Sequence, residues 1–161
     1  MISFLLIILY IIYNIINYGI PKSISATYYS LKYKITFSII LLLSIIFSFE
    51  DFMLITPENF KFLPFLFLTG IIFVSAAPNF RTNKFIENVH NWSAIISFIL
   101  SQIWVAIVDP TPLILWLFII GYVIVKFKKY KSLSLIIENT CVKFWAELVM
   151  ICIIFSEIIG Y

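Results

Sequence analysis

Charged residues are scarce in this sequence: only 12% of its 161 residues are Asp, Glu, Lys or Arg, while 63% are apolar. Soluble domains average about 25% charged and about 45–50% apolar residues. A chain of this length could not bury so much apolar surface in its own core, so the sequence excludes a soluble domain and lipid is the expected solvent. The net charge of +3 is small, and we expect no nucleic-acid partner.

Histidine and cysteine are nearly absent as well. His90 is the only histidine, and the two cysteines, Cys141 and Cys152, stand eleven residues apart. That spacing is about 16 Å along a helix, too far for a disulfide, whose Cα atoms lie within about 7 Å. This set cannot form a zinc site, and we expect no metal or cofactor. A Ser-His-Asp set, an HExxH motif and a Walker loop are missing too, so the sequence favours a non-enzymatic protein without catalytic residues.

Glycine occurs only four times, and no GxxxG motif is present. Membrane helices that approach closely use small residues at their contact. Close packing here would therefore have to use serine and alanine, which concentrate near residues 75–77 and 93–101.

Long, nearly continuous apolar runs fill most of the chain. Transmembrane strands of a β-barrel would show about ten residues with period-two alternation, which these runs lack. We therefore predict an all-α, polytopic integral membrane protein that forms a single helical bundle over residues 1–161. The predicted spans cover residues 2–18, 35–49, 57–77, 91–108, 112–127 and 140–159.

Polar residues and prolines predict where these helices begin and end. Glu50 and Asp51 are expected to end the second span, and Thr56-Pro57 to start the third as cap and first helical residue. Thr82 or Asn83 can cap the fourth helix, and Ser132 or Ser134 can cap the last one. The polar segment 22–34 is expected to form a short helix in the headgroup region.

The distribution of cations predicts the orientation. Ten of the eleven fall on alternate connections, on one side of a six-span bundle; these are Lys22, Lys32, Lys34, Arg81, Lys84, Lys126, Lys128, Lys129, Lys131 and Lys143. Positive residues favour the cytoplasmic side, so both termini are expected outside. Trp92 and Trp145 then lie near the inner interface and Trp104 and Trp116 near the outer one, as in an aromatic belt.

The fourth span carries a polar seam and is expected at the centre of the bundle. Ser93, Ser97 and Ser101 share one helical face because they are four residues apart, with Gln102 beside the far end and His90 one turn before the start. The seam has two interpretations. It can line a polar pathway, or it can let helices pack closely while the hydroxyls bond to carbonyls one turn earlier.

Glu147 is the most informative single residue, because an acid inside a span indicates a functional site by default. A local ion pair with Lys143, four residues earlier on the same face, is the alternative. Glu157 is expected to be solvated at the outer end. If a site exists, we expect a cytoplasm-facing cleft formed by residues 19–29 and 73–81, close to His90 and Glu147.

Three short sequence motifs resemble those of a known group of proteins: Gly19-Ile-Pro-Lys-Ser-Ile-Ser-Ala-Thr-Tyr-Tyr29, Phe73-Val-Ser-Ala-Ala-Pro78, and Val89-His90 followed by Ser101-Gln-Ile-Trp104. They resemble uncharacterised small multi-spanning membrane proteins of Bacteroidetes and their crAss-like phages. The resemblance covers most of the chain. It implies a bacterial or phage origin and an inner-membrane location, and it brings no assigned activity.

Two functions follow as hypotheses. The first is a small channel- or carrier-like protein for an ion or small solute along the fourth span, with His90, Ser93, Ser97, Ser101, Gln102 and Glu147 as binding or pathway residues. The second is a non-transporting interaction protein, such as a phage-encoded modulator of a host membrane complex, that acts on a membrane-protein partner through its basic cytoplasmic face. Six short helices bury a modest interior, which favours self-association into a homo-oligomer.

Overall fold

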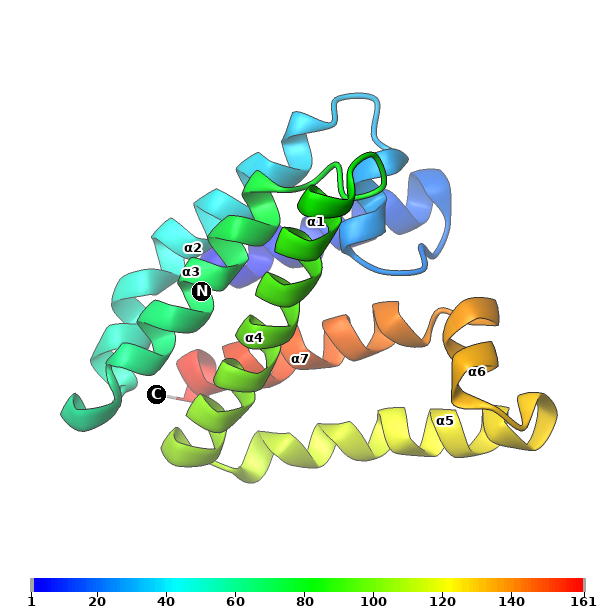
Figure 1. Ribbon diagram of the computed structural model, residues 1–161. Coiled ribbons are helices and arrows are strands. Elements are labelled where there is room, and N and C mark those ends of the chain that lie inside the picture. Colours follow the sequence, from blue (N-terminus) through cyan, green and yellow to red (C-terminus); the bar gives the residue numbers. More distant parts are fainter. Residues whose placement is uncertain (1, 161) are drawn as a thin grey trace.

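The computed structural model describes residues 2–160, and these residues form helices joined by short connections (Figure 1). The α-helices are α1 (Ile2–Tyr18), α2 (Ile35–Ile55), α3 (Phe62–Ala76), α4 (Lys84–Val108), α5 (Trp116–Tyr130), α6 (Leu133–Asn139) and α7 (Val142–Gly160). Three 3₁₀ helices are η1 (Ser25–Tyr29), η2 (Glu58–Phe60) and η3 (Thr111–Leu115). The described part of the chain contains no strand, which confirms the all-α prediction.

Four helical segments of the described chain are long and apolar enough to cross a membrane: Ile35–Ile55, Glu58–Ala76, Lys84–Val108 and Thr111–Tyr130. Many large apolar side chains on them are exposed on the outside of the bundle, including the whole outer face of α5. Such a surface would be unstable in water and is suited to lipid. The fold therefore indicates a membrane-integral protein.

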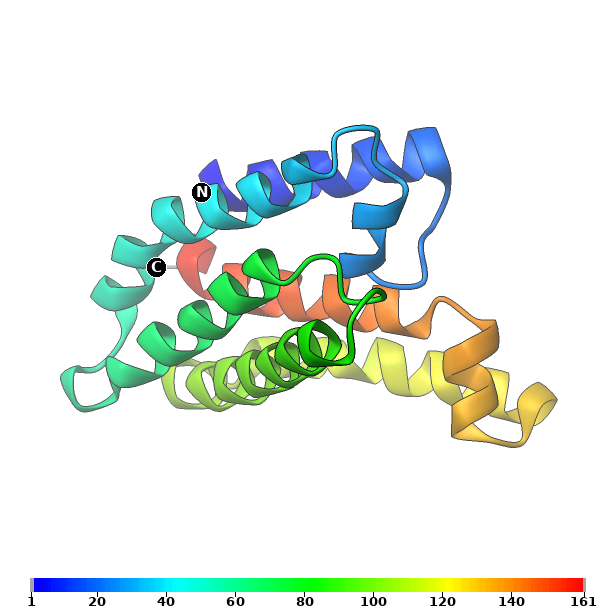
Figure 2. The same ribbon diagram turned by 45° about the horizontal axis from the view of Figure 1, so that its top comes forward.

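The long helices run back and forth between two ends of the bundle (Figures 1 and 2). The start of α1, the end of α7, the α2–α3 turn and the α4–α5 turn lie at one end. The connections 19–34, 77–83 and 131–141 lie at the other. Helices α1 and α2 form one layer, which packs on α3 and α7, whereas α4 and α5 lie beyond them (Figure 2).

Helix α7 occupies the central position that the sequence assigned to the fourth span. It contacts α2, α4, α5 and α6, whereas α4 packs mainly along α3 and crosses α7 at a steep angle (Figure 1). In the tilted view, α7 lies between α1 and α5 (Figure 2). The reason is that α4 exposes apolar side chains such as Ile96, Ile99 and Ile103 on its outer face, while α7 is covered on several sides.

Helix ends follow the sequence signals in some places and not in others. Asn83 caps α4, as predicted, because its side-chain oxygen accepts a hydrogen bond of 2.8 Å from the Phe85 N–H. Helix α2 does not end at Glu50 and Asp51 but continues to Ile55. Phe52 in this extra stretch is buried in the core, and only Thr56, which precedes a proline, leaves the helical conformation.

The last predicted helix is divided in two. The seven-residue helix α6 ends at Asn139, and α7 starts at Val142. Thr140 has an extended backbone; its hydroxyl donates to the Ile136 carbonyl at 2.6 Å and accepts from the Val142 N–H at 3.3 Å. One threonine therefore closes the first helix and caps the second, and the chain turns a corner there.

The turn between α4 and η3 is held by Asp109. Its carboxylate accepts a hydrogen bond of 2.9 Å from the Thr111 N–H. These bonds to Thr111 favour the charged form and lower the pKa of the exposed Asp109 carboxyl.

Glu157 on α7 is not the solvated residue that we expected, because its side chain is only 7% exposed. It lies on the face of α7 that packs into the bundle, one turn beyond the buried residues 153–155.

The core is rich in aromatic rings. Phe52, Phe67, Phe155 and Trp104 pack together with ring centroids 5.2 to 5.9 Å apart. Trp104 is completely buried, and its indole N–H donates to the Thr56 hydroxyl at 2.7 Å. Its assignment to an outer aromatic belt is therefore wrong. This side chain joins α4 to the end of α2 instead of anchoring the bundle at an interface.

Candidate binding site: an apolar cavity at the centre of the bundle

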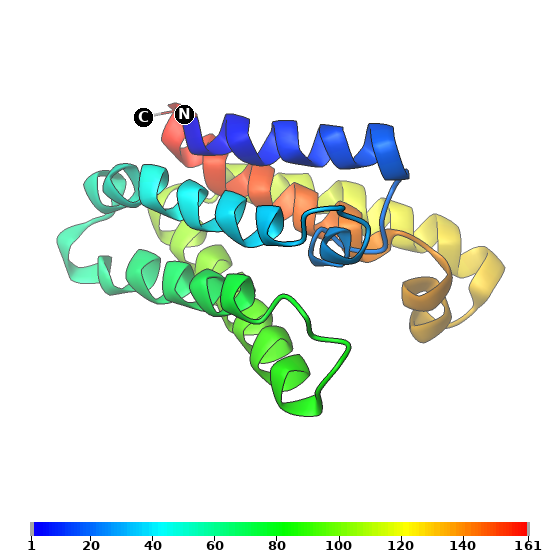
Figure 3. The ribbon, with the colours of Figure 1, turned by 90° about the horizontal axis from the view of Figure 1, so that it is seen from above.

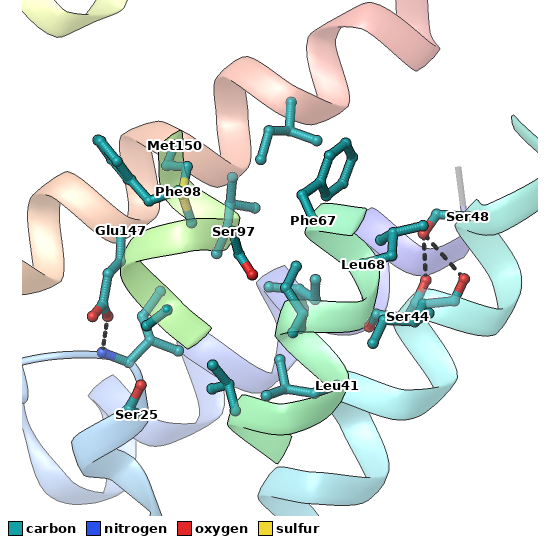
Figure 4. Close-up of a pocket in the computed structure, with 18 of the residues that line it drawn as sticks. Ser25, Leu41, Ser44, Ser48, Phe67, Leu68, Ser97, Phe98, Glu147 and Met150 are labelled. Carbon is teal, nitrogen blue, oxygen red and sulfur yellow. Dashed lines mark hydrogen bonds between the residues drawn. The ribbon is translucent and has the colours of Figure 1, made fainter. Parts of the chain in front are cut away.

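A cavity of about 340 Å³ lies between α1, α2, α3, α4 and α7, with η1 at one end (Figure 4). Its walls are formed largely by isoleucine, leucine and phenylalanine side chains, among them Phe37, Phe67 and Phe155. The polar lining residues are Ser25, Ser44, Ser48, Ser97 and Glu147. Pockets of about 300–1,000 Å³ with mostly apolar walls and few polar groups are typical of small-molecule sites.

Two of these serines add little polarity to the cavity. The Ser44 hydroxyl donates to the Ile40 carbonyl at 2.8 Å, and the Ser48 hydroxyl donates to the Ser44 carbonyl at 2.6 Å. Both groups are therefore satisfied by the backbone of α2 itself, as serines in membrane helices often are. The wall that α2 contributes is effectively apolar.

Ser97 lies where α3 and α4 come closest. A Cβ atom added to Gly70 of α3 would clash with the Ser97 hydroxyl and lie 3.1 Å from the Ser93 carbonyl oxygen. Gly70 thus provides the space that allows α4 to approach. Within the described chain, the buried Ser97 hydroxyl has no hydrogen-bond partner, and it points into the cavity (Figure 4). It serves close packing and also offers an unused polar group to the cavity.

Glu147 forms the polar end of the cavity. This partly buried carboxylate on α7 accepts a hydrogen bond from the backbone N–H of Ile24, the residue before η1. Nearby, the Phe144 N–H in the first turn of α7 donates to the Lys22 carbonyl at 3.1 Å. Free N–H groups at a helix start need such partners. These two bonds attach the connection after α1 to the start of α7.

The same connection is anchored to α1 on its other side. The Tyr10 hydroxyl lies 2.5 Å from the Thr27 hydroxyl, which in turn donates to the Ile24 carbonyl at 2.6 Å. Both residues are buried. The sequence predicted a short helix in the headgroup region over residues 22–34, and the short 3₁₀ helix η1 lies there. Segment 20–31, which contains η1, is not a separate surface helix. It is folded against the bundle, where Ile24 and Ser25 close one end of the cavity.

The remaining seam residues of α4 lie outside the cavity. The Ser101 hydroxyl donates to the Phe98 carbonyl at 2.9 Å. Gln102 accepts a hydrogen bond of 2.8 Å from the Trp116 indole N–H and donates to the Ser101 hydroxyl at 3.3 Å. Ser93 contributes its carbonyl to the contact with Gly70. Of the serines predicted on this seam, Ser97 alone is among the cavity-lining residues in the described chain.

His90 is buried under an aromatic cover at the same end of the bundle as Glu147. It is 3% exposed, its Nδ1–H donates to the Ala77 carbonyl at 3.0 Å, and Phe80 stacks on it with centroids 4.3 Å apart. Tyr29 contacts Phe80 and accepts a hydrogen bond of 2.7 Å from the Arg81 N–H. The two connections that we expected to form a cleft therefore meet, but His90 does not line the cavity.

Sequence reasoning missed most of the cavity wall, which comes from α2 and α3. The only signal on α2 was the pair Ser44 and Ser48, which share a face at a spacing of four residues. On α3 the signal was Gly70, a glycine within an apolar run. The structure shows that Ser97 lies against it. Neither signal indicated that these faces meet around a cavity.

The described residues contain no group of three or more His, Cys, Asp or Glu side chains that could hold a metal ion. Comparisons with known proteins gave no match: no family model, no curated protein and no solved structure is similar to this chain. The resemblance of the three sequence motifs to small membrane proteins of Bacteroidetes and their phages stays a prediction. Function therefore has to be argued from the geometry of the cavity.

Proposed function

We propose that six helices cross the membrane, namely α1 to α5 and α7, with both termini outside. Two observations support this proposal. The six helices alternate between the two ends of the bundle (Figures 1 and 3), and the end that contains connections 19–34, 77–83 and 131–141 carries ten of the eleven cations. By the positive-inside rule this end is cytoplasmic. The cavity end formed by Glu147 and Ser25 then faces the cytoplasm.

This topology predicts the behaviour of fusion proteins. Alkaline phosphatase, which is active only outside the cytoplasm, is expected to be active when fused to either terminus. The same enzyme inserted after Lys131, between α5 and α6, is expected to be inactive, while a fluorescent protein inserted there should fluoresce. A cytoplasmic location of either terminus would contradict the proposed orientation.

We further propose that the protein is a carrier-type membrane protein that binds one small molecule with an apolar body in the central cavity. The observation that carries this proposal is the cavity itself, which is apolar along its length and polar at one end. A molecule that fills such a space gains contacts with its walls, worth about 24 cal/mol for each Å³ of cavity removed. Ser97 and Glu147 offer it polar contacts in fixed places.

Binding of such a molecule agrees better with the geometry than conduction of an ion along α4. A conducting path needs polar groups that follow one another and stay available to the ion. Here the Ser101 hydroxyl bonds to its own helix, Gln102 bonds to Trp116, and His90 lies under Phe80. The polar residues of the seam are thus used within the protein, apart from Ser97.

Photolabelling with a diazirine-bearing decanol in lipid nanodiscs tests the binding proposal. We expect saturable labelling of cavity residues on α2, α3 and α7, which unlabelled decanol displaces. Ala94→Leu extends a side chain from α4 into the cavity and is expected to weaken binding at least tenfold. Ala106→Leu is the matched control, because Ala106 is an exposed alanine of the same helix and does not line the cavity.

The proposal fails if decanol labels the wild-type protein without saturation, or if Ala94→Leu and Ala106→Leu bind it equally. Saturable binding also has an independent readout in thermal stability. A ligand at 100 times its dissociation constant stabilises the folded state by about 2.7 kcal/mol. The unfolding temperature of the wild type should therefore rise with decanol, and that of Ala94→Leu should rise much less.

A second candidate function is interaction with another membrane protein through the basic face. Helix α5 ends in Lys126, Lys128 and Lys129, and the following helix α6 exposes Leu133 and Leu135 beside them. Protein interfaces have an apolar core and a polar rim, and these leucines and lysines could supply the two. This function does not need the cavity, so Ala94→Leu would leave partner binding intact while it abolishes decanol binding.

A further inference from the structure

We infer that the molecule bound in the central cavity is a cationic amphiphile, with an alkyl or similarly apolar body and a protonated amine as its head. This inference rests on the proposed binding function and adds the chemical class of the ligand. It is drawn from the charge of the cavity lining, the acceptors at its polar end and the connection that closes that end.

Any charge on the cavity lining is negative and confined to one residue. Glu147 is the only ionisable side chain among the residues of the described chain that line the cavity. The cations closest to it in sequence or across the connection, Lys143 and Lys22, are exposed and do not line the cavity. A carboxylate next to apolar walls is expensive to keep charged unless a cation or hydrogen-bond donors compensate it. An amine head supplies both.

The polar end of the cavity offers acceptors for an amine. A carboxylate has two oxygens with about four lone-pair sites, and the Ile24 N–H uses one site on Glu147. The Ser25 hydroxyl lies beside this hydrogen bond and also lines the cavity (Figure 4). An ammonium group with three N–H donors can therefore bond to Glu147 and Ser25 together, while its alkyl chain extends along the walls of α2 and α3.

Other head groups fit this end less well. A fatty acid would bring a second carboxylate against Glu147, and like charges at close range repel strongly in an apolar site. Phosphate-bearing heads are normally held by arginine or lysine, and no such residue lines the cavity in the described chain. A neutral alcohol can donate one hydrogen bond but brings no positive charge to Glu147. The lining thus discriminates by charge.

A head group that binds Glu147 also affects the connection that covers this end of the cavity. Ile24 is buried, lines the cavity and is held by the very carboxylate that the amine would bind. An ammonium that bonds to Glu147 therefore shares or replaces the contact that attaches segment 20–31 to α7. The amine would thus bond to the Glu147 carboxylate, the same acceptor that now holds Ile24 over the polar end of the cavity.

Competition between matched probes tests the ligand class. Decylamine, decanol and decanoate are compared at neutral pH for displacement of the diazirine-bearing decanol, at equal mole fractions in the nanodisc lipid. We expect decylamine to bind at least tenfold more tightly than decanol, and decanoate more weakly than either. In Glu147→Gln, which removes the charge and keeps the shape, the ratio of decylamine to decanol affinity should fall at least tenfold.

Ser25→Ala provides a second variant in case Glu147→Gln does not fold, and it should lower the same affinity ratio several-fold. Ser30→Ala is its matched control, because Ser30 is an exposed serine of the same connection and does not line the cavity. Decanol binding equal to or tighter than that of decylamine in the wild type would overturn the amine inference while leaving the binding function in place. If none of the three probes displaces the label, the binding function itself fails.

Discussion

Trp104→Ala is expected to destabilise the protein by about 3–5 kcal/mol, the cost of removing a large aromatic side chain from a packed core. Trp104 is completely buried and touches Phe52 and Phe67, with ring centroids 5.2 and 5.7 Å away. The measurement is the free energy of unfolding in mixed detergent micelles. Helix packing in membranes depends strongly on such contacts, so the whole decrease in the free energy of unfolding should be measurable.

The matched control is Trp92→Ala, because Trp92 lies on the same helix and is 63% exposed. It should change the free energy of unfolding by well under 1 kcal/mol. Trp104→Phe separates packing from hydrogen bonding, since it keeps a ring but loses the donor to Thr56. It should cost about 1 kcal/mol. If the two alanine variants were equally stable, Trp104 could not be the core residue described above.

Gly70→Ala is expected to lower the free energy of unfolding by about 1–3 kcal/mol, as overpacking of a tight contact does. The added methyl group would clash with the Ser97 hydroxyl and lie 3.1 Å from the Ser93 carbonyl. Backbone at 3.1 Å cannot yield without moving the two helices apart. The same measurement in mixed micelles applies, and the separation of α3 from α4 can be followed by a pair of spin labels.

Gly121→Ala is the control for this change, because nothing lies within 4 Å of a Cβ atom added at Gly121 of α5. An alanine in a helix is otherwise more stable than a glycine by about 1 kcal/mol, so this variant should be neutral or more stable. Adding Ser97→Gly to Gly70→Ala removes the clashing hydroxyl and should restore part of the lost stability. A Gly70→Ala protein as stable as Gly121→Ala would contradict the close contact between α3 and α4.

Several local features could be predicted from sequence because they depend on neighbouring residues only. Asn83 caps α4 since its side chain reaches the N–H groups two residues on. The pair Thr56-Pro57 is a local signal too, because the proline moves Thr56 out of the helical conformation and α2 ends there, but we predicted that end at Glu50 and Asp51. The prediction that residues 19–29 and 73–81 lie near each other at the cationic end also agrees with the contact between Tyr29 and Phe80.

Other features were predicted wrongly for one physical reason. In a soluble helix, polar residues mark the outer face, but here lipid and protein core are both apolar. Sequence periodicity therefore cannot say whether Trp104 faces lipid or the core, or whether Glu157 faces solvent or the bundle. Thr140 posed a similar problem, since a threonine between two apolar stretches is compatible with a continuous helix as well as with the corner that it forms.

By itself, the sequence determined that the chain is helical and suited to lipid, because composition and the length of apolar runs decide these properties. It also determined the asymmetry of charge between the two ends of the bundle. Only the tertiary structure decided that Gly70 meets Ser97, that Glu147 holds the Ile24 N–H, and that five helices line an apolar cavity with one acid among its described lining residues. These contacts join residues up to 123 positions apart. They depend on how each helix is rotated against its neighbours, which packing of complementary shapes sets and no local pattern encodes.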